Sequence, residues 1–320
     1  MLMFCNSFDH YNDLSLKWTT PGGTISFGPG ARTGPGSLVI QGILAPTLGF
    51  AGVSGIVCGC AFNTQTLSGR PLSVDPATLH VGINGDGSFS LDDVTGTVAR
   101  SAGGLIQTGQ YNYFEMKAQI LSPSHGVATV RLNGVTLMNA VNWTPNSGNT
   151  TFTSFGLVGP GAGLSANVDD LYICDLSGST NNDFLGAIRI YAVVPSANGT
   201  PVNWTPNGAA TNFQCVNSVP PGTPFVSGAA VNVTDQYIYD VSSVPAGLQI
   251  FGLQHILNAQ LASAGSRQIA SIVNGIVGPP SAPTTTEKMM KTPYDKNPAT
   301  GLAWTTSDFP ATELGVTITV

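Results

Sequence analysis

Short segments of alternating apolar and polar residues, separated by turn residues, recur along most of this sequence. In residues 111–121 (YNYFEMKAQIL), Phe114, Met116 and Ile120 share one face, while Tyr113 and Glu115 lie on the other, more polar face. A period of two is typical of a strand that buries one face. The same alternation occurs at residues 79–83, 89–91, 126–132 and 135–138, and the residues 133–134 (NG) fit a two-residue hairpin turn. The chain is therefore predicted to be all-β.

The composition indicates a folded chain with an unusually uncharged surface. Of the 320 residues, 42% are hydrophobic and only 9% are charged, with 39 Gly and 22 Pro. Disordered chains combine low hydrophobicity with high net charge, so this chain is expected to fold. A soluble protein normally keeps many charges on its surface. The low charge therefore favours a protein whose surface is largely covered by neighbouring subunits.

The sequence argues against several classes of partner and location. Eleven Lys and Arg residues against 17 Asp and Glu leave no basic surface for nucleic acid. No apolar stretch reaches membrane-spanning length, and the first residues lack the features of a signal peptide. The five cysteines are too sparse for a secreted disulfide framework. Cys58 and Cys60 are two residues apart, so we expect them on one buried face of a strand.

The strand pattern divides the chain into two β-sandwich domains in series, residues 1–185 and 186–320. In the second, strands are predicted at 236–241, 248–261, 268–276 and 314–320. Residues 277–298 are rich in Pro and Thr and are predicted to form a long loop or an arm. This arm would contact a neighbouring subunit through five consecutive residues, namely Glu287, Lys288, Met289, Met290 and Lys291.

The segment 168–186 (VDDLYICDLSGSTNNDFLG) leaves three interpretations open for its acidic residues. Neighbouring residues of a strand point to opposite faces, so Asp169 and Asp170 are not expected to form a facing acid/base pair, and catalysis is the least favoured of the three. One of them could accept hydrogen bonds from backbone donors, a purely structural role. Alternatively, Asp9, Asp169 and Asp170 could supply three of the six or more oxygens that a structural calcium ion requires. No other cofactor is predicted.

The aromatic residues and histidines offer few candidates for ligand binding or catalysis. Tyr113, on the polar face of its strand, is the best single candidate for stacking on a sugar ring. The four tryptophans are expected to be core or interface anchors. The four histidines lie in separate segments and are expected to be structural, and no Gly-x-Ser-x-Gly motif occurs. The chain is therefore predicted not to be an enzyme.

Several short motifs carry a resemblance to known families. SFDHY (7–11), YFEMK (113–117), GVATVRLNG (126–134) and VDDLYICD (168–175) together resemble a laminin-G or concanavalin-like jelly roll. In that fold the first and last strands lie close together. With STNNDFLG (179–186) and PATGLAW (298–304) added, the set resembles a group of tailed-bacteriophage virion proteins described as structural.

The resemblance implies a non-enzymatic virion component that is assembled in the bacterial host cytoplasm. A tail-associated fibre, collar or appendage protein and a capsid decoration protein are both compatible with it. Its partners would be other virion proteins, including copies of itself. The alternative is a carbohydrate-binding module that recognises a host surface glycan, which would need an exposed aromatic platform. Glycan hydrolysis would need two facing carboxylates, for which the sequence offers the least support.

Overall fold

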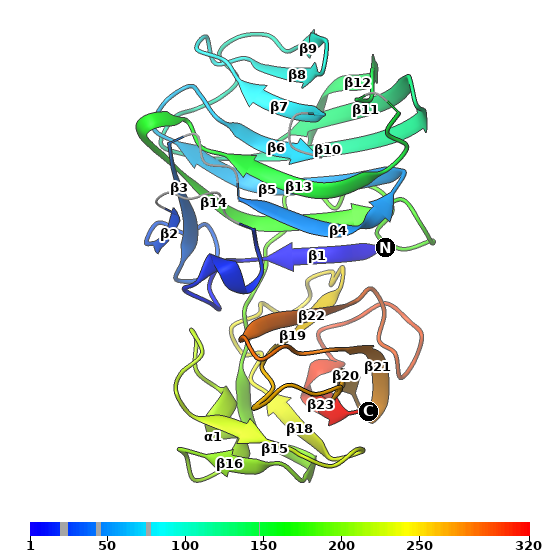
Figure 1. Ribbon diagram of the computed structural model, residues 1–320. Helices are drawn as coiled ribbons and strands as arrows, with labels where there is room; N and C mark the ends of the chain where they lie inside the picture. The colour runs from blue at the N-terminus through cyan, green and yellow to red at the C-terminus, as the bar shows by residue number, and fades with distance from the viewer. Residues whose placement is uncertain (20–24, 43–45, 75–77, 147) are drawn as a thin grey trace. The chain divides into compact units, whose positions relative to one another are not determined.

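The computed structural model describes residues 1–19, 25–42, 46–74, 78–146 and 148–320 and confirms the all-β prediction (Figure 1). The chain forms two compact units, Met1–Ile190 and Tyr191–Val320. The predicted boundary after residue 185 is thus displaced by a few residues, because 186–190 are bonded to the first unit. Within the described residues, no helix is both long and apolar enough to cross a membrane.

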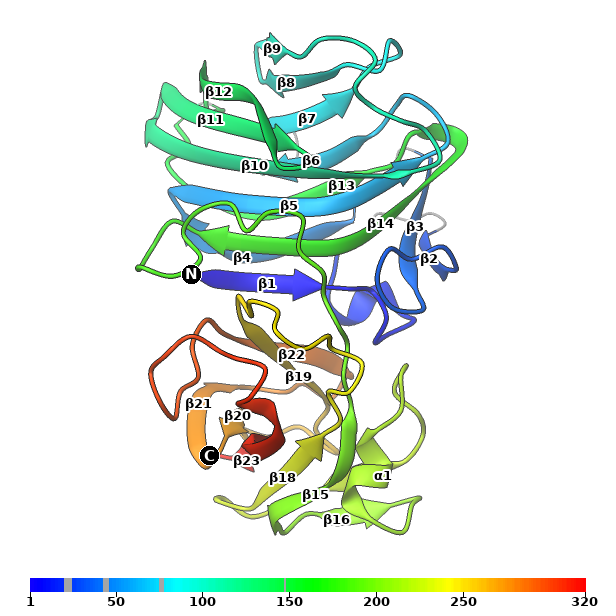
Figure 2. The same ribbon diagram turned by 180° about the vertical axis from the view of Figure 1, so that it is seen from behind.

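The first unit consists of two antiparallel sheets (Figures 1 and 2). The larger sheet has the order β12 (Val135–Trp143), β11 (His125–Leu132), β10 (Tyr111–Ser122), β5 (Gly55–Thr64), β14 (Gly161–Asp175), β3 (Ser37–Gly42) and β2 (Ile25–Gly28), and β1 (Leu2–Asn6) pairs with β14. The other sheet has the order β4 (Thr47–Val53), β13 (Phe152–Val158), β6 (Arg70–Val74), β7 (Leu79–Ile83), β8 (Phe89–Asp93) and β9 (Gly96–Arg100). The short helix η1 (Leu14–Leu16) follows β1. The pairing of β1 with β14 confirms that the first and last strands of this domain are neighbours.

Both faces of β10 are buried over residues 112–116. The alternation of the sequence predicts burial of one face, and another segment of the chain covers the second face. Phe114 and Met116 are fully buried, as are Cys58 and Cys60 on the neighbouring β5. Glu115, predicted to lie on a polar face, is also fully buried. The prediction of a half-buried strand is therefore wrong for this part of β10. A single strand's pattern does not reveal that another segment covers its second face.

The turn between β11 and β12 forms as its sequence predicts. Asn133 has φ 51° and Gly134 has φ 81°, the left-handed region that a two-residue hairpin turn requires. Glycine has no Cβ and asparagine tolerates this region, so the pair NG accepts the turn with little strain.

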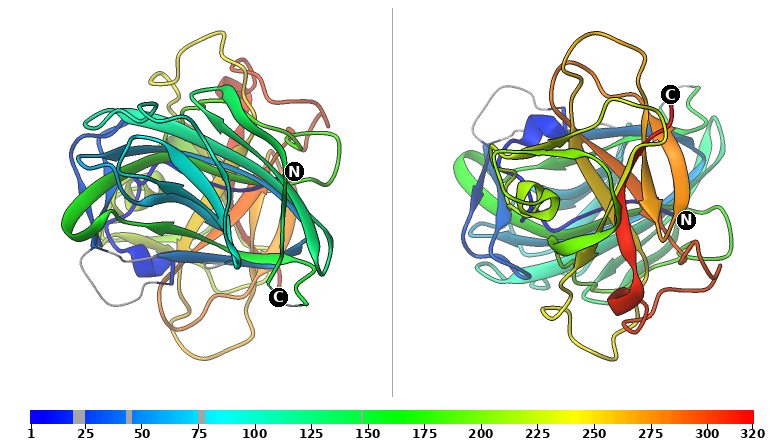
Figure 3. Two further views of the ribbon diagram at one scale, coloured as in Figure 1. Left: turned by 90° about the horizontal axis from the view of Figure 1, so that it is seen from above. Right: turned by 90° about the horizontal axis from the view of Figure 1, so that it is seen from below.

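The second unit is built from one five-stranded sheet and two shorter pairs. The sheet order is β15 (Pro195–Val202), β18 (Thr234–Tyr239), β23 (Glu313–Ile318), β20 (Ile269–Val273) and β21 (Ile276–Ser281). The other pairs are β19 (Leu253–Ala259) with β22 (Lys288–Tyr294), and β16 (Thr205–Asn207) with β17 (Phe225–Ser227). Helix α1 (Asn212–Val216) contacts β15, and η2 (Phe309–Ala311) leads into β23 (Figure 3). Leu257 and Met290 pack against Val316 of the sheet, which makes this unit a small sandwich.

The predicted arm at 277–298 is wrong, because most of it lies in strands. Residues 288–294 form β22, which pairs with all seven residues of β19. Met289 is buried, whereas Glu287 and Lys288 are exposed. Three of the five prolines that suggested a loop lie in strands, Pro279 and Pro280 in the edge strand β21 and Pro293 near the end of β22, where a missing N–H is tolerated. A deletion of this segment would remove a structural strand.

Candidate functional site

A β-bulge at Asp169 and Asp170 determines how these two acidic residues are used. The register between β14 and β5 shifts between Asp169 and Tyr172, and Asp170 has φ 49°. A bulge breaks the strict alternation of a strand. Both carboxyl groups consequently reach the same loop, at Arg32 and Thr33. The expectation that they point to opposite faces is wrong, because it assumed a regular pleat.

Both oxygens of the Asp169 carboxyl group accept hydrogen bonds from backbone donors. Oδ2 accepts from the N–H groups of Arg32 (2.7 Å) and Thr33 (2.9 Å), and Oδ1 accepts from the N–H of Asp170 (2.7 Å). The residue is fully buried. Asp169 therefore compensates three backbone donors that would otherwise be unsatisfied inside the protein.

Asp170 joins the same loop to the segment that leaves the sheet. Its Oδ2 accepts from Arg32 Nη1 (2.6 Å) and the Thr33 hydroxyl (2.9 Å), and its Oδ1 accepts from the N–H of Ile190 (2.8 Å). Arg32 also donates to the carbonyl oxygens of Ala187 (3.2 Å) and Ile188 (2.6 Å). The Arg32 guanidinium group therefore joins Asp170 of β14 to residues 187–188, and Asp170 itself holds Ile190.

We call residues 183–190 the strap, because they cross the outer face of the larger sheet (Figure 2). Beneath the strap, Glu115 Oε1 accepts from the Tyr172 hydroxyl (2.6 Å) and from the N–H of Gly186 (2.8 Å). Apolar strap residues pack on a cluster that includes Tyr172; these are Phe184, Leu185 and Ile188. The strap thus closes the face that β10 would otherwise expose.

The exposed end of the strap is held by two contacts with basic residues. Lys117 Nζ lies 3.2 Å from a carboxylate oxygen of Asp183. The guanidinium carbon of Arg131 lies 4.1 Å from the centre of the Phe184 ring. Asp183 Oδ1 also accepts from the N–H of Phe184 (2.8 Å), so this carboxylate is bonded both to the backbone of the strap and to Lys117.

The electrostatic environment of the bulge is that of a buried structural site. Burial raises the pKa of Asp169 to about 7, and the negative charge of Asp170 adds to this effect. Burial also raises the pKa of Asp170, although the bond from Ile190 and the charge of Arg32 oppose the change. Both side chains are fully enclosed by the protein. They are not available to act on a substrate.

Asp9, Asp169 and Asp170 do not form the predicted set of calcium ligands. Asp9 Oδ1 accepts from the N–H of Gly36 (2.7 Å), and the oxygens of the other two are used by the donors described above. Among the residues that the structure describes, no group of three Asp, Glu, His or Cys side chains is placed to hold a metal ion. The arrangement matches the structural hydrogen-bonding interpretation instead.

Tyr113 is not available to stack on a sugar, so this prediction is wrong. Its side chain is 2% exposed and lies beneath the guanidinium group of Arg32, whose carbon is 5.0 Å from the ring centre. Its hydroxyl donates to the backbone oxygen of Asp170 (2.9 Å). The strap and the Arg32 loop cover the face that the alternation left open.

Replacing Tyr113 by phenylalanine tests this structural role. The substitution leaves the ring in place and removes one buried hydrogen bond, so we expect the free energy of unfolding to fall by about 1 kcal/mol. Urea denaturation followed by the fluorescence of the buried tryptophans measures the change. An unchanged stability would argue that the hydroxyl contributes nothing to the bulge.

The second unit contains a buried histidine that is also structural. His255 Nδ1 lies 2.6 Å from the Ser271 hydroxyl, and its Nε2 lies 3.4 Å from the Tyr239 hydroxyl. Burial lowers the pKa of His255 to about 4. Ser271 is itself buried, so this Ser–His pair has no access to a substrate. His80 is held differently, with Nε2 3.3 Å from Asp92 Oδ2 on the neighbouring strand.

Three residues that organise these sites were not singled out from the sequence. Arg32 lies in a glycine-rich loop (30–36), and Glu115 is one of two charged residues in β10, with Lys117 two positions further on. The third, Asp235, is fully buried in the second unit. It accepts from the N–H groups of Asn203 and Trp204, from Asn212 Nδ2 and from the Tyr237 hydroxyl, at 2.7–2.8 Å. The strand pattern offers no signal for Glu115, because Lys117 lies on the same face of the same strand and is only partly buried.

Comparisons with known proteins find similar chains among solved structures only. No protein-family model and no curated protein sequence matches the chain. Among solved structures, it is similar to the cellulose-induced protein Cip1 at 15% identity and a TM-score of 0.41, over 54% of this chain and 97% of that one. A Bacillus subtilis protein with a galectin-like fold matches at 12% identity and 0.38, over 54% and 96% of the two chains.

A third similar structure is an enzyme. The endo-β-1,4-glucuronan lyase of Trichoderma reesei matches at 11% identity and a TM-score of 0.38, over 55% of this chain and 96% of that one. These neighbours share a galectin-like or jelly-roll β-sandwich fold. All three TM-scores are below 0.5, so these similarities support no conclusion about this chain.

Proposed function

We propose that the protein is a non-enzymatic structural component of a bacteriophage particle, assembled with other virion proteins and with copies of itself. The observation that carries this proposal is the convergence of three motifs on one place in the first unit. Asp9 of SFDHY binds the loop 30–36 through Gly36, and VDDLYICD binds the same loop through Asp169 and Asp170. STNNDFLG supplies the start of the strap. The shared motifs thus serve to fasten segments together.

The strap, which fixes the end of the first unit, also supports the proposal. It ends at Ile190, where the second unit begins, so the hydrogen bonds of Asp170 and Arg32 fix the point at which the chain leaves the first unit. All four carboxylate oxygens of Asp169 and Asp170 accept hydrogen bonds from other parts of the first unit. This use of the carboxylates supports a structural role over glycan cleavage, which would require two carboxylates facing a substrate.

Purified particles of the phage that encodes the protein provide the test. We expect quantitative mass spectrometry to find the protein in particles in many copies, and gold-labelled antibodies to mark the tail, the collar or the capsid. Labelling of one of these places would also decide between an appendage and a decoration protein. Recovery of the protein only from the soluble fraction of the lysate, with none in purified particles, would contradict the proposal.

A further inference from the structure

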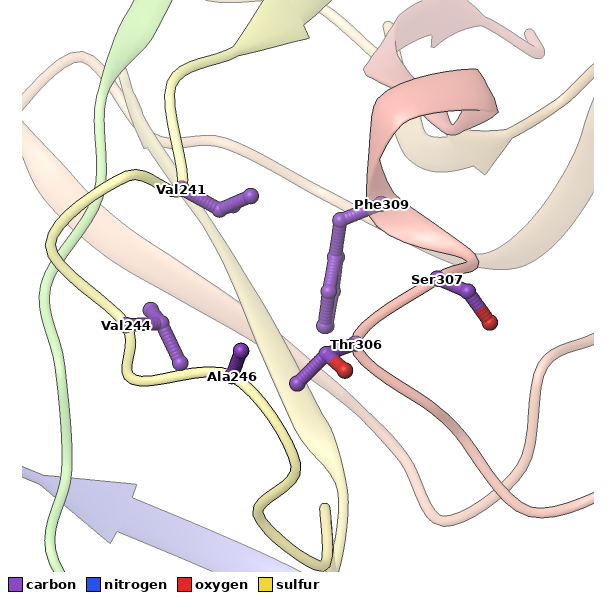
Figure 4. Close-up of a pocket in the computed structure, with 6 residues that line it drawn as sticks. All are labelled: Val241, Val244, Ala246, Thr306, Ser307 and Phe309. Atoms are coloured by element: carbon purple, nitrogen blue, oxygen red, sulfur yellow. The ribbon is translucent and has the colours of Figure 1, made fainter.

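Two loops of the second unit line an open pocket of about 240 Å³ (Figure 4). Val241, Val244 and Ala246 line one side, and Thr306, Ser307 and Phe309 line the other. All except the two hydroxyl-bearing residues present apolar side chains. None of the six is fully buried, so the pocket is open to solvent. An open, mostly apolar cavity with a few polar groups is the usual form of a small-ligand site.

Phe309 gives this pocket an aromatic platform. Its ring lies parallel to that of Trp304, with an angle of 3° between the rings and 5.7 Å between their centres. Trp304 is buried and supports the ring from behind. In Figure 4 the Phe309 ring extends between the two loops, towards Val244 and Ala246. A rigid ring that is fixed in this way can pack against the apolar face of a sugar ring without losing further freedom.

The charge around the pocket limits which sugars it would accept. Asp240 directly precedes Val241, and Asp308 directly precedes Phe309. Asp240 is exposed, and a hydrogen bond from the N–H of Ser242 lowers its pKa, so it is negatively charged at neutral pH. None of the immediate chain neighbours of the lining residues is Lys or Arg. An anionic sugar would therefore be repelled, while carboxylates can accept hydrogen bonds from sugar hydroxyl or amino groups.

We propose that this pocket binds one ring of a neutral or amino sugar, with the ring's apolar face on Phe309 and its hydroxyl groups towards Thr306 and the exposed carboxylate of Asp240. The volume suits a single ring. The site would give the second unit a recognition role of its own. It does not depend on the virion proposal, because binding is a property of the isolated protein.

Saturation-transfer NMR on the full-length protein tests this directly. The probes are glucose, galactose, N-acetylglucosamine and glucosamine, with galacturonate as the anionic comparison. We expect saturation of the ring protons of at least one neutral or amino sugar, with weak, millimolar affinity, and a signal at least about tenfold lower for galacturonate at the same concentration. The absence of saturation for all the neutral and amino sugars would overturn the proposal, as would equal saturation of galacturonate.

Variants of the pocket locate the binding. Ala246→Trp would fill the cavity from an exposed position, and Phe309→Ala would remove the platform. Phe225→Ala is the matched control, because Phe225 is a 56% exposed phenylalanine elsewhere in the same unit. We expect both pocket variants to lose at least about tenfold in affinity and the control to lose none. Thermal unfolding confirms that each variant is folded. Retained binding in folded Ala246→Trp would place the sugar elsewhere and overturn the assignment.

The Ala246→Trp variant also distinguishes sugar binding in the pocket from binding of a side chain of another protein. If wild-type protein binds no sugar and Ala246→Trp is excluded from phage particles, the pocket holds a side chain of another virion protein and the sugar proposal is wrong. If the sugar signal is present in the wild type and lost in Ala246→Trp while particles still incorporate the variant, both proposals stand. Sugar binding by a protein that is absent from particles would remove only the virion proposal.

Discussion

Replacing Asp170 by alanine is expected to lower the free energy of unfolding of the first unit by about 3–5 kcal/mol. The carboxylate is fully buried and pairs with Arg32 at 2.6 Å. Its removal would leave a largely buried guanidinium group without its counter-ion, and the Thr33 hydroxyl and the Ile190 N–H without their acceptor. Breaking a buried pair is costly because the remaining charge stays out of water.

Hydrogen exchange detected by mass spectrometry, at increasing urea concentration, gives the stability of each unit separately. Peptides from β1 and β14 report on the first unit. Asp183→Ala is the matched control, since it also removes an acidic partner of a basic residue, but at a 67% exposed side chain. Exposed pairs contribute about 0–1 kcal/mol, so the control should change little. Equal effects of the two substitutions would refute the role assigned to the bulge.

Lowering the pH from about 6.5 to about 4 is expected to cost the second unit about 3 kcal/mol through His255 alone. Burial lowers the pKa of this histidine from 6.5 to about 4. Between these two values the unfolded chain binds a proton at this residue and the folded chain does not. The contribution of neutral His255 to the free energy of unfolding is therefore fully present above the pKa of the unfolded chain. It is lost as the pH falls through this window, and it does not change further below about pH 4.

The measurement is urea denaturation across this pH range, read from exchange of β19 and β20 peptides. In His255→Gln the pH dependence of this unit should be weaker by about 3 kcal/mol across the window. His125→Gln, at an exposed histidine of the first unit, should leave it unchanged. The free energy of unfolding must be measured for each unit separately, because Asp169 in the first unit has the opposite pH dependence. Burial raises the pKa of Asp169 to about 7, so its contribution to the stability of the first unit falls as the pH rises from about 4 to 7. A parallel pH dependence in wild type and His255→Gln would contradict the burial argument.

The local features of this fold follow from its sequence because they depend on neighbouring residues only. The alternation in β10 and β11 and the positive φ angles at Asn133 and Gly134 are set by side chains within a few positions of each other. The burial of Cys58 and Cys60 follows in the same way from their spacing on β5. These properties hold whichever segments pack against the strands, so they could be predicted.

The roles of the candidate site residues depend on which distant segment covers each face. Tyr113 and Glu115 are buried because the strap and the Arg32 loop, far away in the sequence, lie over β10. Asp169 and Asp170 act together because a bulge, fixed by contacts with a distant loop, breaks the alternation of β14. No spacing within VDDLYICD encodes that loop. The sequence alone therefore determined an all-β chain with its turns, and the tertiary structure decided that its acidic residues hold segments together inside the protein.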